Sequence, residues 1–101
     1  LQNLLSTFKG VETFGSFGHL ADGNLHIEVV GPAIDDFAVD YAVLKLVAEF
    51  NGSISAEHGI GRAKREYLSL TRPALEIEIG KQIKTVFDPT GLFNPGVLYV
   101  D

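Results

Sequence analysis

The chain of 101 residues contains no cysteine and no methionine. Without cysteine it has neither a disulfide framework nor a thiolate ligand for a metal, so any bound metal must be held by imidazole and carboxylate groups. This excludes zinc-finger folds. The absence of cysteine is compatible with a reducing compartment but does not require one.

Long apolar runs and basic patches are also missing. Charged residues or glycines interrupt every apolar stretch well before the roughly 18 residues that a membrane span needs, so we expect no membrane-spanning segment and no signal segment. Eight Lys and Arg stand against 13 Asp and Glu, which gives a net charge of −5. The basic residues are scattered except for Arg62, Lys64 and Arg65, and nucleic acid is therefore not an expected partner.

The length and the apolar content of 46% predict a single globular unit with one modest core. The chain opens at Leu1 with LQNLLSTFKG, which is typical of the end of a helix, and a strand follows directly. We interpret the chain as a piece of a longer protein. A small processed protein is the alternative.

The first half of the chain predicts a hairpin followed by a helix. Residues 11–19 and 24–30 alternate in polarity and flank Asp22-Gly23, the commonest short hairpin signal. Asp35 and Asp36 then open a segment whose apolar residues recur at spacings of three and four, up to Asn51-Gly52.

The second half predicts a short strand at 53–55, a helical turn at 64–70 and a long helix. This helix follows Pro73, has Thr71 as a candidate cap, and ends at Asp88-Pro89. The apolar run 97–100 is a candidate edge strand. One face of the long helix carries Leu75, Ile79, Ile83 and Val86. The whole order predicts an α+β fold, with helices on one face of an antiparallel sheet.

His19 and His26 lie on either side of the expected hairpin turn. If Asp22 and Gly23 are the two central residues of a tight turn, the histidines pair directly, with Cβ atoms about 4.5–5.5 Å apart on one face. Both rings could then reach one ion at about 2.0–2.1 Å. A longer loop would change the register. An ordinary cross-strand contact between two polar residues is the alternative.

A second group of polar residues is found in SAEHGIGRAKREYL, residues 55–68. On an extended backbone Glu57 and His58 point to opposite sides, and Gly59 and Gly61 leave the backbone bare for a ligand or another chain segment. Two imidazoles and one carboxylate would form a three-ligand metal site with open positions. Alternatively, Glu57 and His58 are exposed loop residues, and the basic group at 62–65 is a solvated face.

Three segments resemble the closing motifs of the FAD-linked oxidase C-terminal domain, and they occur in family order: GHLADGNLH, SISAEHGIGRAKREYL and FDPTGLFNPG. The family includes D-2-hydroxyglutarate dehydrogenase, D-lactate dehydrogenase and the glycolate oxidase flavin subunit. The resemblance implies that residues 1–101 are the C-terminal part of the substrate and metal domain, with the FAD-binding domain outside this chain. The implied fold is an incomplete ferredoxin-like sandwich.

The resemblance also implies roles for individual residues. By match, His19, His26 and Glu57 would bind a divalent metal, zinc or manganese. His58 would accept the proton of the substrate hydroxyl while hydride passes to FAD; an imidazole titrates near neutral pH, which suits a general base. The metal would act on the substrate oxygens as a Lewis acid.

Further residues are candidates for binding. Asn24 and Lys64 are the candidate substrate contacts, and Asn94 lies in a segment that resembles one running near the flavin. Glu28 stands where some members have Asn, and alternation puts it on the histidine face, where it could add a fourth ligand or alter substrate preference. Ala21 replaces the usual Gly, and Val97 stands where Lys is common.

The implied activity is the oxidation of a D-2-hydroxy acid to the 2-oxo acid by the full-length protein, the fragment alone being inactive. The alternative is a free-standing metal-binding or interaction module without redox activity. The sequence does not identify the electron acceptor or the particular hydroxy acid. We expect a cytoplasmic protein, with a peripheral membrane location or a mitochondrial one as variants, and a homodimer is a candidate assembly because apolar sheet surface would be exposed.

Overall fold

The computed structural model describes residues 1–100, and the chain divides into two compact units, Leu1–Phe50 and Asn51–Asp101. This differs from the single core that the length predicts. Leu5 and Val39 are the buried apolar residues of the first unit, and Ile54 and Leu68 are those of the second. Each core is small because about 50 residues can remove only a limited share of their surface from water.

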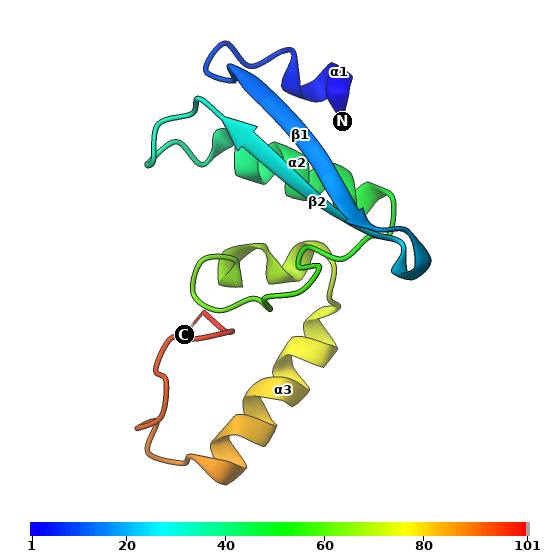
Figure 1. Ribbon diagram of the computed structural model, residues 1–101. Coiled ribbons are helices and arrows are strands. Elements are labelled where there is room, and N and C mark those ends of the chain that lie inside the picture. The colour runs from blue at the N-terminus through cyan, green and yellow to red at the C-terminus, as the bar shows by residue number, and fades with distance from the viewer. Residues whose placement is uncertain (101) are drawn as a thin grey trace. The chain divides into compact units, whose positions relative to one another are not determined.

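The first unit is a β-hairpin with two helices (Figure 1). The hairpin and the long helix confirm the sequence-based expectation. The helix begins where the Asp36 carboxylate accepts a hydrogen bond from the Ala38 N–H at 3.1 Å, and Asn51, with a φ of 56°, follows its end. The elements are α1 (Gln2–Leu5), β1 (Thr13–His19), the short 3₁₀ helix η1 (Leu20–Asp22), β2 (Asn24–Val30) and α2 (Ala38–Glu49).

The hairpin turn is longer than the sequence predicts. A two-residue turn of the commonest type needs a positive φ at both central residues, but of Asp22 and Gly23 only Gly23 has one, at 67°. Instead η1 makes a 3₁₀ turn, which the Gly23 N–H closes by donating to the Leu20 carbonyl at 3.3 Å. The connection is therefore residues 20–23, and His19 pairs with Asn24. The expected direct pairing of His19 with His26 is wrong.

The second unit contains η2 (Arg65–Leu70) and α3 (Ala74–Phe87), which confirms the expected helical turn and long helix. α3 begins directly after Pro73 with no side-chain cap, so Thr71 does not cap it. The strands expected at 53–55 and 97–100 are wrong: in residues 1–100 the sheet consists of β1 and β2. Local turns compete with strand pairing there, since Ser53 Oγ donates to the Ser55 carbonyl at 2.9 Å and Leu98 has a φ of 73°.

Helix α3 has two different faces. One face contacts the C-terminal segment, where Gly80 leaves room for the Tyr99 ring and Lys81 donates to the Val100 carbonyl at 2.8 Å. The other is the predicted apolar stripe, and its side chains are 46–77% exposed. The periodicity located the stripe correctly; the C-terminal segment reaches only its edge, where Ile83 lines a hollow, and the stripe stays largely exposed. Its residues are Leu75, Ile79, Ile83 and Val86.

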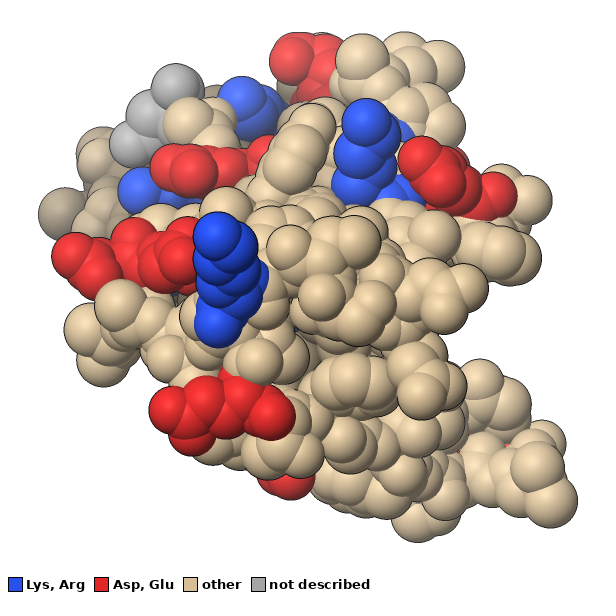
Figure 2. All heavy atoms as spheres, turned by 90° about the horizontal axis from the view of Figure 1, so that it is seen from above, with Lys and Arg blue, Asp and Glu red and all other residues tan. Residues whose placement is uncertain are grey.

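The antiparallel hairpin and the helices define a small α+β structure, which confirms the predicted class. Its completion into a ferredoxin-like sandwich requires further strands and stays a prediction. None of the helices in the described part of the chain is long and apolar enough to cross a membrane. On the face seen in Figure 2, the few Lys and Arg side chains lie beside acidic ones, and much of the surface is uncharged.

Candidate functional site

The polar candidates of the first unit share one face of the hairpin. Paired residues project to the same side, and the pairs on this side are His19 with Asn24 and Phe17 with His26. Glu28, two residues after His26, joins them, as alternation predicts. His19 and His26 are therefore diagonal neighbours, with Cβ atoms up to about 7–8 Å apart rather than directly opposed. The shift of two residues keeps both imidazoles on one face.

The other face of the hairpin is apolar. It carries Phe14, Ile27 and Val29, which are all half-buried. Burial of this side fixes which side chains remain on the histidine face, because a slip of one residue would exchange the two faces.

The His26 ring is stacked on the ring of Phe17. Their centroids are 5.1 Å apart and the planes are 9° from parallel. Stacking uses the face of an imidazole and leaves both nitrogens at its edge, so Phe17 orients the ring without occupying a nitrogen. Sequence reasoning missed Phe17, although an aromatic residue two positions before His19 was a signal that could have found it.

Gly18 allows the two strands to approach closely beside His19. A Cβ at this position would collide with the Asn24 carbonyl group. Because backbone atoms cannot move aside as a flexible side chain can, glycine is required here for the pairing that aligns His19 with Asn24.

In the second unit, Glu57 and His58 lie in a loop rather than on an extended backbone. Their side chains approach to 3.9 Å between Glu57 Oε2 and His58 Nε2, so the expectation that they point to opposite sides is wrong. The cause is local: Ser55 Oγ donates to the Gly59 carbonyl at 2.8 Å, and Gly59 has a φ of 76°. The His58 side chain is 90% exposed, which makes the imidazole accessible.

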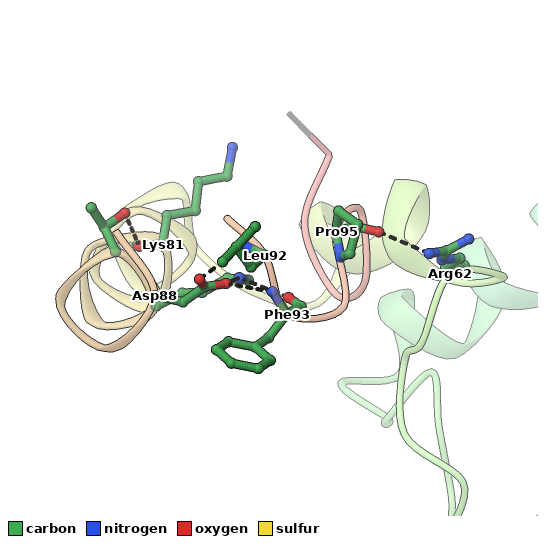
Figure 3. Close-up of polar contacts among 8 residues, drawn as sticks. Arg62, Lys81, Asp88, Leu92, Phe93 and Pro95 are labelled. Carbon is green, nitrogen blue, oxygen red and sulfur yellow. Dashed lines mark hydrogen bonds and ion pairs between the residues drawn. The ribbon is translucent and has the colours of Figure 1, made fainter. Parts of the chain in front are cut away.

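Two motifs that are far apart in sequence meet within this unit. Arg62 donates to the Pro95 carbonyl at 3.0 Å (Figure 3), and Arg65 donates to the Gly96 carbonyl at 2.6 Å. The Leu98 N–H donates to the Gly61 carbonyl at 2.9 Å. The Gly61 carbonyl thus contacts another chain segment, although a Cβ at this position would meet no atom within 4 Å and the glycine is suited instead to its φ of 56°. The expectation that Arg62 and Arg65 are only solvated surface residues is therefore wrong. No local sequence pattern indicates these contacts, because their acceptors lie more than 30 residues away.

The segment 94–98 has an unusual backbone. Asn94, Gly96 and Leu98 all have positive φ values, of 47°, 70° and 73°. For residues other than glycine this conformation costs about 1–3 kcal/mol each, and it persists only where the surroundings hold it. The contacts with the loop around residues 61–65 are such surroundings.

Asn94 also lines an open hollow between α3 and the C-terminal segment. The hollow has a volume of about 540 Å³, and its wall includes Ile83, Phe87, Phe93 and Tyr99. Apolar and aromatic walls with a few polar groups occur in many small-molecule sites, although this hollow is open rather than enclosed. Lys64 is half-buried at the start of η2, outside this wall.

Asp88 organises the turn after α3 (Figure 3). Its carboxylate accepts hydrogen bonds from the Lys84 ammonium at 2.8 Å, the Leu92 N–H at 2.9 Å and the Phe93 N–H at 3.0 Å. The hydrogen bond from Lys84, aided by those of the two amides, lowers the pKa of Asp88 below its ordinary value of 3.8, against the opposing effect of burial.

This arrangement predicts a pH dependence of the turn. The pKa of Asp88 is lower in the folded protein than its ordinary value of 3.8. The ionised Asp88 carboxylate therefore stabilises the turn fully at pH values above 3.8, and this stabilisation is lost as the pH falls through the lower pKa of the folded protein. We expect the amides of Leu92 and Phe93 to lose protection from hydrogen exchange over that interval, after correction for the intrinsic rate. In Asp88→Ala both amides should be unprotected at neutral pH as well, whereas Glu49→Ala, which removes an exposed acid at the end of α2, should protect them like the wild type. Full protection in Asp88→Ala would contradict this role.

The donor set can be tested against a metal. His19 and His26 supply two imidazoles on one face, and Glu57 supplies a carboxylate from the second unit; imidazole nitrogen and carboxylate oxygen are accepted by both zinc and manganese. Within residues 1–100 no three such side chains are gathered as a metal site. The donor types alone fit a divalent metal, and the assignment of the three ligands stays a prediction.

Comparison with known proteins defines the class. Residues 3–98 match the family model described as FAD linked oxidases, C-terminal domain, and the chain belongs to this family. The match covers all three motifs and confirms the resemblance.

Relatives in this family carry dehydrogenase names. The chain is 46% identical over 91 residues to D-2-hydroxyglutarate dehydrogenase from Stutzerimonas stutzeri, covering 82% of the chain and 20% of the relative. It is 50% identical over 91 residues to the protein of the same name from Xanthomonas citri, with 82% and 19% covered. To D-lactate dehydrogenase from Anaerostipes hadrus it is 42% identical over 88 residues, with 80% and 18% covered. The chain thus spans about a fifth of the length of these curated relatives. No solved structure matches it.

Proposed function

We propose that this chain is the C-terminal part, residues 1–101, of the substrate and metal domain of an FAD-dependent dehydrogenase that oxidises a D-2-hydroxy acid to the 2-oxo acid. The observation that carries the proposal is the match of residues 3–98 to the FAD linked oxidases, C-terminal domain. The names of the relatives support 2-hydroxy acids as the substrate class. The domain that binds most of the FAD lies outside this chain in the proposal.

His58 is the proposed general base. Its imidazole accepts the proton of the substrate hydroxyl while a hydride leaves the carbon that carries this hydroxyl, so that the product is the 2-oxo acid. Its exposure of 90% supports this role, because a base must reach its substrate. FAD, when bound, supplies the acceptor for the hydride.

His19, His26 and Glu57 are the proposed ligands of a divalent zinc or manganese ion. The shared face of the two histidines supports the proposal. A metal held there supplies Lewis-acid activation of the substrate oxygens. Glu28 on the same face is a candidate fourth ligand.

The remaining assignments concern binding. Asn24, paired with His19, and Lys64 are proposed to contact the substrate, and Asn94, in the wall of the hollow, is proposed to lie near the flavin. A homodimer would cover exposed apolar residues on the other face of the hairpin, such as Leu25, which is 57% exposed. A cytoplasmic location, or a mitochondrial one in a eukaryote, remains part of the proposal.

The full-length protein tests this function. Purified with its natural cofactors, it is expected to contain FAD and a divalent metal, measured by absorbance and by elemental analysis. It should reduce an artificial dye with one member of a panel of D-2-hydroxy acids and not with the L-enantiomer. Metal binding without FAD or turnover would overturn the proposal in favour of a free-standing metal-binding module.

A further inference from the structure

We infer that Arg62 and Arg65 are positioning residues that hold the loop of His58 against the segment of Asn94. The inference rests on the proposed function for the roles of His58 and Asn94. The contacts themselves are independent of it: each guanidinium reaches a backbone carbonyl more than 30 residues away in the sequence, at 3.0 Å for Arg62 and 2.6 Å for Arg65.

The fit between Arg65 and Gly96 is close. A Cβ on residue 96 would lie 2.6 Å from Arg65 Nη1, and Gly96 has a φ of 70°. Glycine at 96 therefore serves two purposes, since it adopts the left-handed conformation and leaves a place for the guanidinium. Arg65 and Gly96 thus form one contact that joins the motif SISAEHGIGRAKREYL to the motif FDPTGLFNPG.

The segment 94–98 needs such support. Asn94 and Leu98 are held at positive φ without being glycines, and Pro95 has no N–H to donate. The Val97 N–H donates to the Asn94 carbonyl at 3.2 Å, and the Leu98 N–H uses the Gly61 carbonyl at 2.9 Å. The carbonyls of Pro95 and Gly96 accept from the two arginines. Arginine is suited to this because its planar guanidinium donates in fixed directions.

The two arginines thereby link both proposed sites. Arg62 follows His58 by four residues. The loop between them includes Gly59, whose carbonyl accepts a hydrogen bond of 2.8 Å from Ser55 Oγ. The acceptors of the two arginines, Pro95 and Gly96, follow Asn94 directly. The link would set the position of the base relative to the flavin-side segment, and a misplacement of 1 Å can reduce turnover about 100-fold.

The experiment compares Arg65→Leu, Arg65→Lys and Arg72→Leu in the full-length protein. Arg72 is the matched control, because its partner is the exposed Glu76 at 3.8 Å on the surface of α3. Hydrogen exchange of the peptide that contains residues 94–98 is measured by mass spectrometry, together with kcat, KM and the flavin absorbance spectrum.

For Arg65→Leu we expect exchange of this peptide to rise about tenfold, in line with a loss of local opening free energy, and kcat to fall about 100-fold at nearly constant KM. Arg65→Lys should restore part of the protection from exchange and part of kcat. Arg72→Leu should resemble the wild type in both measurements. Unchanged exchange would overturn the contact, and raised exchange with unchanged kcat would overturn the positioning role. If Arg65→Leu does not fold, Arg62→Leu takes its place with the same criteria.

The two proposals fail in different ways. A wild-type protein without turnover refutes the proposed function, and the exchange measurement then still decides whether the arginines hold the segment. If the wild-type protein turns over substrate and the folded arginine variant keeps the same kcat, the inference is refuted and the proposed function stands.

Discussion

His26→Ala in the full-length protein is expected to lose its divalent metal and its turnover of D-2-hydroxy acids while keeping FAD. His26 is one of the two imidazoles on the hairpin face, and its removal takes away a direct ligand. Loss of a residue that only orients a ligand already costs about 10–100-fold in metal affinity, so we expect a decrease of at least about 100-fold. FAD should remain because its main binding domain lies outside the substituted region in the proposal.

Three measurements check this result: metal content by elemental analysis, FAD content by absorbance, and dye reduction with substrate. Thr13→Ala is the control, since Thr13 lies on the same face at the far end of the hairpin, opposite Val30. It should keep metal, flavin and activity. Turnover by metal-free His26→Ala protein would refute the ligand assignment, and loss of FAD together with the metal would indicate unfolding instead.

His58→Ala is expected to keep the metal and to slow the chemical step by about 10²–10⁴-fold, the usual contribution of a positioned general base. The His58 side chain is 90% exposed and contacts Glu57 only at 3.9 Å. Truncation of such a residue rarely disturbs the fold. A slower reaction can therefore be assigned to the missing imidazole rather than to lost packing.

The chemical step is isolated by rapid mixing of the oxidised protein with substrate and following the reduction of the flavin in a single turnover. Metal content should equal that of the wild type, which separates this variant from His26→Ala. Glu57→Gln provides the neighbouring comparison, because loss of the proposed ligand should lower metal content as well as rate. An unchanged rate of flavin reduction in His58→Ala would rule out the base role.

Local sequence patterns predicted most of the secondary structure. The alternation on both sides of Asp22-Gly23 located β1 and β2, and residues at helical spacing located α2 and α3. These signals are local, because a period of about two or 3.6 residues is written into neighbouring side chains. The same alternation placed the two histidines on one face, and the three motifs identified the family.

The predictions failed where a choice depended on contacts or on competing local hydrogen bonds. Asp22-Gly23 is compatible with several turns, and the 3₁₀ turn at Leu20 changed the partner of His19 to Asn24. The residues 53–55 have the composition of a strand, but no partner strand pairs with them in the described residues, and Ser53 closes a turn instead.

Composition and periodicity were thus sufficient for the class, the long helices and the hairpin, whereas the roles of the candidate site residues came from the resemblance to the family and stay predictions. The stacking of Phe17 on His26 and the reach of Arg62 and Arg65 to the segment 95–96 emerged only from the folded chain. The reason is physical: which side chains meet across a strand pair or across 30 residues depends on register and loop path, and many loop paths share the same local pattern.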